Sequence, residues 1–324
     1  MPLDPDIADF LDLVELGRLS GKLRPVHEMP VDEARAAYAR AAESFEGSSV
    51  TQVRVRELRL PARDGADIAA RLYAPEEHPT GPLPVLLFLH GGGYVLGDLD
   101  SHDGICRDLA HRSSWAVLAP AYRLAPAHRF PTALHDCLDA VHWLATDGPA
   151  QGLDTRRLVV AGDSVGGSMA AVLAILAVRE PARMPLAPMR QILIYPVTDA
   201  AGSHPSQQRF ASGHLLELAA LDWFYGHYQS RPADRQDWRF SPLRAPDLAG
   251  VAPAFVLLAE FDPLLDEGLA YVRRLKESGV PVEVTVRPGM IHDFLRMPAV
   301  TAEAQRSRQQ IADLLRKMPA RQPR

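Results

Sequence analysis

The 324-residue sequence has few cysteines, no dense basic block and no long apolar run. It has only two cysteines, Cys106 and Cys137; both fall in amphipathic helical patterns without metal-ligand spacing, so we interpret them as buried small side chains. Basic residues, mostly Arg, form no dense block and the net charge is −5, so nucleic acid is not an expected partner. The longest apolar run, residues 169–178, is too short to span a bilayer. The acidic first residues lack the apolar core of a signal peptide, which predicts a cytoplasmic protein without stable membrane association.

Strand patterns alternate with helical patterns over most of the chain. A helical section comes first: Asp4 and Pro5 form a typical helix start, and a second helix is expected from residue 31 to 43. Eight short apolar or alternating segments then follow, at 51–60, 68–75, 85–89, 116–122, 157–163, 191–196, 254–260 and 282–286. Helical patterns separate the later segments, with the clearest around 134–144, 164–179, 264–278 and 301–317. This order predicts an α/β fold with a central, mostly parallel, eight-stranded sheet flanked by helices.

One section interrupts this alternation. Residues 200–230 are helical and rich in polar and aromatic side chains, which is typical of an insertion over the sheet. We therefore expect four segments: a helical 1–48, a first core part 49–199, the insertion 200–230, and a second core part 231–324.

Three consecutive glycines follow the apolar segment 85–89, in the stretch HGGGYVLGD (residues 90–98). Glycine loses much backbone freedom on folding, so this loop must need bare backbone. The spacing of Gly92 and Gly97 fits a phosphate loop, but Asp98 and Leu99 stand where Lys and Ser or Thr are required. The dinucleotide fingerprint fails as well, so no nucleotide cofactor is expected.

A second glycine-rich turn, Gly162-Asp163-Ser164-Val165-Gly166, links a buried strand pattern to a helix. The pattern G-x-S-x-G in this context places a serine nucleophile on a sharp turn. A helix cap is the competing interpretation, since Asp and Ser are both good caps. The glycine loop favours the nucleophile, because acyl transfer requires amide donors beside the tetrahedral oxyanion.

A serine nucleophile needs a base and an acid that orients the base. In α/β-hydrolases these follow the serine in the order Asp or Glu, then His. Asp262 stands at the end of a strand pattern and is preferred to Glu260 and Asp266. His292 is the only histidine after it, on a loop that Pro288-Gly289 is expected to open by breaking the strand.

The sequence at this point resembles the bacterial hormone-sensitive-lipase-like carboxylesterases with a GDSAG nucleophile motif. The matching stretches are LHGGGYVLGDLDSHD, AYRLAPAHRFP, AGDSVGGSMA, ILIYPVTD, FDPLLDEG and PGMIHDF. The resemblance implies an α/β-hydrolase core, a helical cap built from 1–48 and 200–230, and hydrolysis of short- to medium-chain esters without a cofactor or metal. It assigns catalysis to positions matching Ser164, Asp262 and His292. Members of the family are often dimers, so a homodimer is among the expectations.

Other roles follow the same resemblance. The oxyanion is expected to bind the N–H groups of Gly92, Gly93 and Val165, and the neutral ring of His90 to shape the glycine loop. The candidates to line the substrate pocket are Tyr94, Asp163, Tyr195 and Leu215, with core packing as the alternative for each.

The sequence departs from the family pattern at three places. Val165 stands where Ala is usual, which brings a β-branched side chain to the helix entry. Ala127 and Arg129 replace the usual Glu and Pro, which changes a local charge contact. Asp293 stands where Gly is common; we expect its side chain to face solvent, although a carboxylate pointing inward would raise the pKa of the neighbouring His292.

The triad limits the reaction to acyl transfer but not to one substrate. A serine carboxylesterase acting on a small ester is the preferred function. A ligand-binding protein on the same fold, and an amidase, lactonase or transacylase, are the alternatives. A true lipase is disfavoured because no long apolar lid segment is present.

Overall fold

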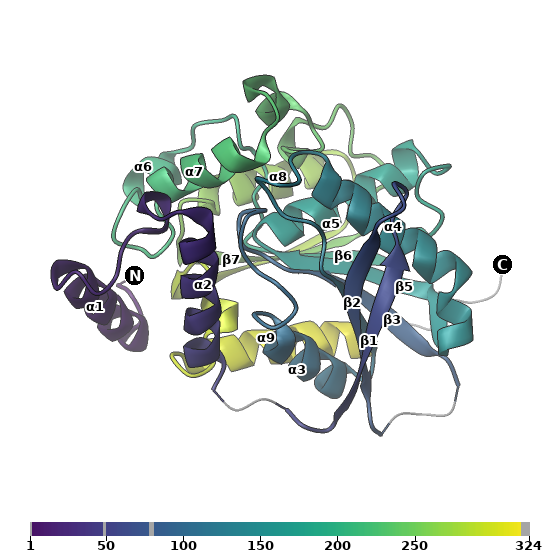
Figure 1. Cartoon of the computed structure of the whole chain (residues 1–324). Coiled ribbons are helices and arrows are strands. Elements are labelled where there is room, and N and C mark those ends of the chain that lie inside the picture. Colours follow the sequence, from purple (N-terminus) through teal and green to yellow (C-terminus); the bar gives the residue numbers. More distant parts are fainter. Residues whose placement is uncertain (1, 48–49, 78–80, 319–324) are drawn as a thin grey trace.

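The computed structural model describes residues 2–47, 50–77 and 81–318, and a single eight-stranded sheet organises them (Figure 1). The strands are β1 Val53–Pro61, β2 Asp67–Pro75, β3 Leu83–Leu89, β4 Ala116–Pro120, β5 Leu153–Asp163, β6 Arg190–Ile194, β7 Ala254–Phe261 and β8 Val282–Ile291. Their order across the sheet is β1-β2-β4-β3-β5-β6-β7-β8. β2 pairs antiparallel with both neighbours, and all other pairs are parallel. The predicted mostly parallel sheet of eight strands is therefore confirmed.

The order places β3 and β5 side by side at the centre of the sheet, where connections leave in opposite directions. In such sheets, ligands bind outside the carboxyl ends of the strands at the point where the order reverses. The glycine loop follows β3, and the turn with Ser164 follows β5. The topology thus brings the two glycine-rich segments to one edge of the sheet.

Nine α-helices lie in the described part of the chain: α1 Pro5–Leu19, α2 Val31–Glu46, α3 Asp103–Ser113, α4 Thr132–Thr146, α5 Val165–Arg179, α6 Pro205–Arg209, α7 Leu218–Tyr228, α8 Leu265–Glu277 and α9 Ala302–Arg316. Side chains of a strand alternate between the two faces of a sheet. On β3, Leu87 and Leu89 accordingly pack with α4, α5 and α8, whereas Leu86 and Phe88 pack with α3 and α9. Both faces of the sheet are covered, which explains the continuous apolar pattern of the central strands.

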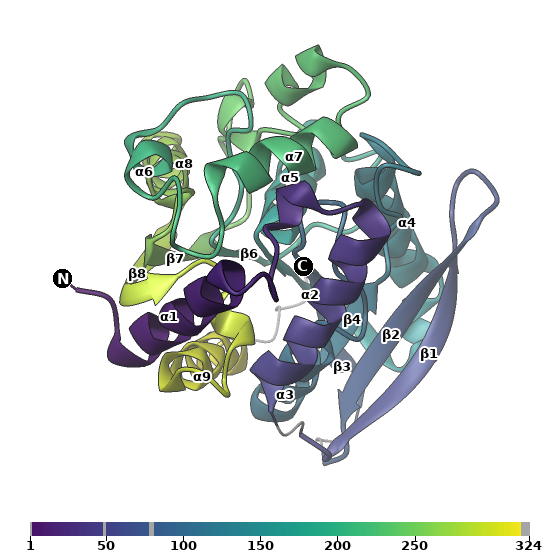
Figure 2. The same cartoon turned by 60° about the vertical axis from the view of Figure 1, so that its left-hand side comes forward.

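The N-terminal helices and the mid-chain insertion lie near each other, outside the sheet (Figures 1 and 2). α1 begins as expected, with the Asp4 side chain accepting a hydrogen bond from the N–H of Asp6. Arg18 on α1 makes a 2.6 Å contact with Glu217, just before α7. α1 also lies beside β8, where the N–H of Asp4 donates to the carbonyl of Gly289. The expected boundary between residues 48 and 49 falls outside the described residues.

The prediction that Pro288-Gly289 breaks the last strand is wrong, because β8 continues to Ile291. The pairing of β7 with β8 shifts register here, which accommodates the irregular backbone. Gly289 has a φ of +72°, and its N–H donates to a carboxylate oxygen of Glu260 at 2.8 Å. A bulge, rather than a loop, therefore leads directly to His292.

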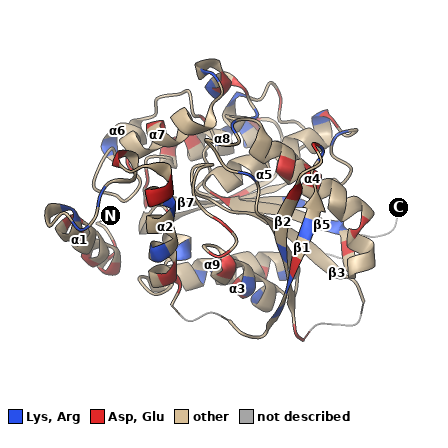
Figure 3. Ribbon diagram, in the orientation of Figure 1, with Lys and Arg blue, Asp and Glu red and all other residues tan. Residues whose placement is uncertain are grey.

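Acidic and basic side chains are interspersed along the ribbon (Figure 3). Within the described residues, no helix has the length and apolar character needed to cross a membrane.

Candidate active site

Ser164 occupies the sharp turn between β5 and α5. Its φ of +55° lies in a region that L-residues rarely adopt, as expected for a nucleophile on a strained turn. A Cβ at Gly162 would lie 2.4 Å from the carbonyl oxygen of Leu89, and one at Gly166 only 1.9 Å from it. Both glycines of the motif are needed so that this turn can pass close to the end of β3.

The structure brings Ser164, His292 and Asp262 together as the sequence predicts. The Nε2 atom of His292 lies 3.0 Å from the Ser164 hydroxyl, and Nδ1 lies 2.7 Å from a carboxylate oxygen of Asp262. Asp262 directly follows β7, and its other oxygen accepts the N–H of Leu264 at 2.8 Å. All three triad side chains are buried. With Nδ1 donating to Asp262, Nε2 is the acceptor for the serine proton.

The surroundings of His292 favour its protonated form. Burial lowers the pKa of His292, but the charge and hydrogen bond of Asp262, followed by the charges of Asp293 and Asp163, outweigh burial and raise it above the usual value. An imidazolium formed during the reaction is therefore stabilised where it forms.

Asp293 points inward rather than out to solvent, contrary to our expectation, and its side chain keeps only 17% of its surface exposed. One carboxylate oxygen accepts a hydrogen bond from Nη1 of Arg296 at 3.1 Å, and the other lies 4.0 Å from Nε2 of His292. Arg296 is buried and its guanidinium lies over the ring of Tyr38 on α2, 4.2 Å from its centre. This cation three residues along the chain draws the carboxylate inward beside the base.

Each of the three consecutive glycines meets a different neighbour. A Cβ on Gly91 would lie 2.3 Å from the Asp163 carboxylate, and one on Gly92 would lie 2.3 Å from the carbonyl oxygen of Leu96. A Cβ on Gly93 would lie 2.2 Å from the ring of Phe224 on α7. Gly92 and Gly93 also have positive φ angles of 112° and 64°. The loop therefore tolerates no side chain at any of these positions.

The N–H groups of this loop divide into two sets. The N–H of Gly91 donates to Asp163 at 3.0 Å. Within the described residues, no acceptor is recorded for the N–H groups of Gly92, Gly93 or Val165. These three amides can therefore donate to an oxyanion, whereas the amide of Gly91 is occupied.

The assignment of Asp163 to the substrate pocket is corrected by these contacts. Asp163 is fully buried, and its second oxygen lies 3.3 Å from Nε2 of His102. Burial raises the pKa of Asp163, but the charge and hydrogen bond of His102 outweigh it and hold the pKa below its usual range. The carboxylate therefore anchors the glycine loop. The sequence reasoning did not identify His102 as a site residue. The one sequence feature that could have indicated it is its position within the stretch LHGGGYVLGDLDSHD.

His90 shapes the glycine loop, as expected. Its Nδ1 atom lies 2.7 Å from the carbonyl oxygen of Gly91 and 3.1 Å from the Tyr122 hydroxyl, and its ring stacks on Tyr122 at 4.1 Å. Burial, with a contribution from His102, lowers the pKa of His90 to about 4. The ring is therefore neutral at the pH at which a histidine base works.

The remaining pocket candidates occupy different surroundings. Tyr94 is 1% exposed and stacks on Tyr228 at 3.8 Å, which fits the alternative of core packing. Tyr195 is also buried, but its ring lies 4.6 Å from that of His292. Leu215 is half-buried in the insertion and packs against the core. The pocket roles of Tyr195 and Leu215 stay predictions. The Val165 side chain is buried in the core.

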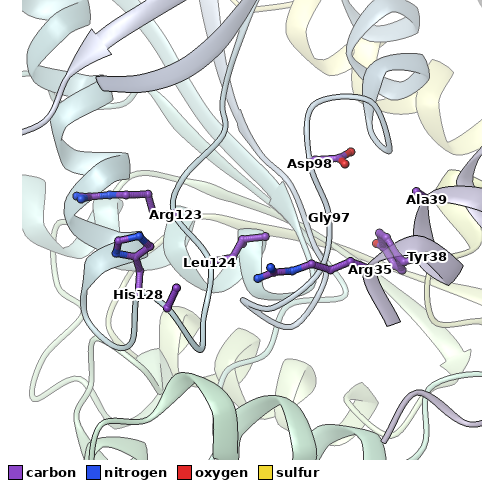
Figure 4. Close-up of a pocket in the computed structure, with 9 residues that line it drawn as sticks. Arg35, Tyr38, Ala39, Gly97, Asp98, Arg123, Leu124 and His128 are labelled. Atoms are coloured by element: carbon purple, nitrogen blue, oxygen red, sulfur yellow. The ribbon is translucent and has the colours of Figure 1, made fainter. Parts of the chain in front are cut away.

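A surface cavity of about 370 Å³ opens beside the glycine loop (Figure 4). Its walls come from α2, from Gly97 and Asp98, and from residues 123–128, and they include none of the triad. Ala127, one of the departures from the family, lies in this wall. Arg129 donates instead to the carbonyl oxygen of Gln229 at 2.7 Å, at the end of α7.

Among the described residues, no group of three or more His, Cys, Asp or Glu side chains could hold a metal ion.

A buried Ser–His–Asp arrangement at the carboxyl ends of a mostly parallel sheet, with a glycine-rich loop after the neighbouring strand, defines the class of α/β hydrolases. A family profile described as the alpha/beta hydrolase fold matches residues 86–296. The ethyl acetate hydrolase of Pseudomonas putida is 48% identical over 307 residues, covering 94% of this chain and 95% of the relative. A carboxylesterase of Mycobacterium tuberculosis is 35% identical, covering 86% and 91%.

Solved structures agree with these sequence relatives. An ester hydrolase from the metagenome of Lake Arreo, in complex with a bipyridine phosphonate derivative, superimposes with a TM-score of 0.91 at 35% identity, covering 97% of this chain and 98% of the other. A thermostable esterase from Pseudomonas putida has a TM-score of 0.90 at 35% identity, covering 97% of each chain. The chain belongs to the hormone-sensitive-lipase-like family of ester hydrolases with the α/β-hydrolase fold.

Proposed function

We propose that the protein is a serine carboxylesterase that hydrolyses short- to medium-chain acyl esters through an acyl-enzyme. The observation that carries this proposal is the continuous chain of contacts from Asp262 through His292 to the Ser164 hydroxyl, at 2.7 and 3.0 Å. The names of its relatives, among them an ethyl acetate hydrolase, support small esters as the substrate class.

In the acylation step, the oxygen of Ser164 attacks the ester carbonyl while Nε2 of His292 takes the serine proton. The tetrahedral intermediate collapses, the bond to the alcohol oxygen breaks, and His292 gives its proton to that oxygen. A water molecule then attacks the acyl-enzyme, losing one proton to His292, and Ser164 regains a proton as the acid leaves. Asp262 keeps the imidazole in the required tautomer throughout.

The oxyanion of each tetrahedral intermediate would be bound by the amides of Gly92, Gly93 and Val165. None of these three amides has an acceptor among the described residues. Each well-placed donor of this kind is worth about 10²–10³ in kcat. Val165 also begins α5, whose positive end favours an anion at this place.

The N-terminal helices and the insertion would form a cap over this site. The support is the packing of Phe224, on α7, directly against Gly93 of the glycine loop. Arg18 and Glu217 join the two parts of this cap at 2.6 Å. A cap anchored so close to the reacting centre limits the room for the substrate. This favours small esters over large lipid esters as substrates.

Hydrolysis of p-nitrophenyl esters of increasing acyl length tests the function. The wild-type protein should prefer short to medium chains, and Ser164→Ala should lose turnover to background because no nucleophile remains. Ser206→Ala is a matched control, since this buried serine bonds to the carbonyl of Pro263 at 2.7 Å and lies outside the triad. Undiminished hydrolysis by Ser164→Ala would contradict the proposal.

A fluorophosphonate probe separates the enzyme from a ligand-binding protein on the same fold. An active enzyme is labelled at Ser164, because its hydroxyl is activated by His292. A binding protein would remain unlabelled. Parallel assays with an amide, a lactone and an added acceptor alcohol compare the ester hydrolase with an amidase, a lactonase or a transacylase.

A further inference from the structure

Asp293 brings a carboxylate close to Nε2 of His292, the atom that would exchange protons with the serine and the leaving alcohol. The Nε2 atom of His292 must give a proton to the leaving oxygen, which requires a hydrogen-bond distance of about 3 Å. One oxygen of Asp293 lies 4.0 Å from the same Nε2 atom. The leaving oxygen and this carboxylate oxygen are therefore at most about 7 Å apart, which is within reach of a substituent on the alcohol.

The carboxylate is held in this direction. Its second oxygen accepts a hydrogen bond from Nη1 of Arg296 at 3.1 Å, and Arg296 is fixed by burial and by stacking on Tyr38. The backbone of Asp293 has a φ of +67°, a conformation that glycine adopts more readily than aspartate. The Asp293 side chain is 17% exposed, so a ligand atom can reach it.

The other acidic groups near His292 do not duplicate this charge beside Nε2. Asp262 is bound to Nδ1, on the opposite edge of the imidazole ring, and is 1% exposed. Asp163 is fully buried beneath the glycine loop. Burial raises the pKa of Tyr195 well above its usual value, so its hydroxyl stays uncharged. Asp293 thus presents a negative charge that the triad itself does not supply.

We propose that Asp293 is a specificity-determining residue that selects esters by the charge of their alcohol, favouring alcohols that carry a cationic ammonium group over neutral alcohols of the same shape. The proposal rests on the proposed esterase function and adds a substrate class to it. Arg296 binds only one of the two carboxylate oxygens and leaves the other facing the reacting centre. An ammonium group two carbons from the leaving oxygen lies within the distance over which this carboxylate acts.

Two acetate esters with nearly the same shape test this proposal. Choline acetate carries a quaternary ammonium, and 3,3-dimethylbutyl acetate replaces its nitrogen with carbon. The release of acid is measured in a pH-stat at one fixed pH, and the ratio of the two kcat/KM values is compared between variants. Because the acyl group is the same, effects of a substitution on the base itself cancel in this ratio.

The wild-type enzyme should prefer the cationic ester by about fivefold or more, since a partly exposed carboxylate at this range is only partly screened. Asp293→Asn should lower the ratio severalfold, toward the ratio of the uncatalysed hydrolysis rates of the two esters at the same pH. Asp293→Gly, which suits the positive φ and removes the side chain, should do the same if the asparagine variant folds poorly. Asp67→Asn removes a charge from an exposed position at the start of β2 and should keep the wild-type ratio.

A wild-type ratio near one, or a ratio that survives both Asp293 substitutions, would overturn the specificity role. In either case hydrolysis of the neutral ester by the wild-type protein leaves the esterase function standing. If the wild-type protein hydrolyses neither ester and Ser164 is not labelled by a fluorophosphonate, the esterase function and this inference both fail.

Discussion

Substitution of Asp163 tests whether this residue contacts substrate or instead positions the glycine loop. It accepts the N–H of Gly91 at 3.0 Å and lies 3.3 Å from His102. Asp163→Ala removes the charged acceptor of the Gly91 N–H, a hydrogen bond worth about 1.5–3 kcal/mol, and leaves that N–H only the longer contact to Nε2 of His102 at 3.3 Å. The glycine loop then loses its tie to the turn that holds Ser164.

The expected result is a loss in kcat with little change in KM. If the loop shift misplaces one oxyanion donor, kcat should fall by about 10²-fold, because each such donor contributes about 10²–10³. KM for a p-nitrophenyl ester should stay within about threefold, since the Asp163 carboxylate is fully buried beneath the glycine loop. Steady-state kinetics with thermal unfolding of the same samples give both quantities.

Asp163→Asn is the matched control, because its amide oxygen can still accept from Gly91 while the charge facing His102 is lost. We expect this variant to retain more activity than Asp163→Ala. The reasoning is refuted if Asp163→Ala raises KM and leaves kcat unchanged. That pattern would return Asp163 to the substrate pocket, where sequence analysis had placed it.

Three further predictions follow from buried or strained groups. Asp293→Asn should move the acid limb of the kcat/KM profile to lower pH, because Asp293 raises the pKa of His292 and only neutral imidazole can accept the serine proton; an unmoved limb would contradict this. Burial raises the pKa of Glu267 from 4.5 to about 8, so its contribution to stability is complete below pH 4.5 and is lost as pH rises through about 8. Wild-type Tm should therefore fall more between pH 5 and 9 than that of Glu267→Gln, and parallel Tm curves would exclude the effect. Gly93→Ala should lower both kcat and Tm, because the added Cβ would lie 2.2 Å from the ring of Phe224. The control Gly65→Ala also has a positive φ, of +85°, but open space around it, so it should lose only about 1–2 kcal/mol of stability and no activity. Equal losses in the two variants would count against the ring contact.

The sheet and the triad could be predicted because they depend on local patterns and on chain order. The strands that precede Ser164 and Asp262 contain buried apolar runs, and each of these two residues directly follows its strand. His292 follows β8, most of which is exposed or half-buried, so its prediction rested on chain order. The order Ser164, Asp262, His292 then leaves few choices. Parallel strands bring those ends to one edge of the sheet, so no distance had to be known in advance.

The supporting contacts could not be predicted in this way, because they join residues far apart in the sequence. Asp163 and Gly91 are separated by 72 residues, and only the pairing of β3 with β5 brings them together. The same limit applies to Asp293, whose direction depends on a buried Arg296 that stacks on Tyr38 of α2. At Pro288-Gly289, the usual strand-breaking rule failed because a bulge absorbed the irregular backbone.

Each of the three consecutive glycines is required by a different neighbouring group. Gly91 makes room for the carboxylate that ties the loop to the nucleophile turn, Gly92 for the carbonyl of Leu96 within the loop, and Gly93 for an aromatic ring of the insertion. A single requirement would have needed only one glycine, and the others would lower stability without benefit. Successive glycines of the loop therefore pack against the nucleophile turn, against the loop's own backbone and against the insertion. The amide of its first glycine is occupied by Asp163, whereas the amides of the second and third glycines have no acceptor among the described residues.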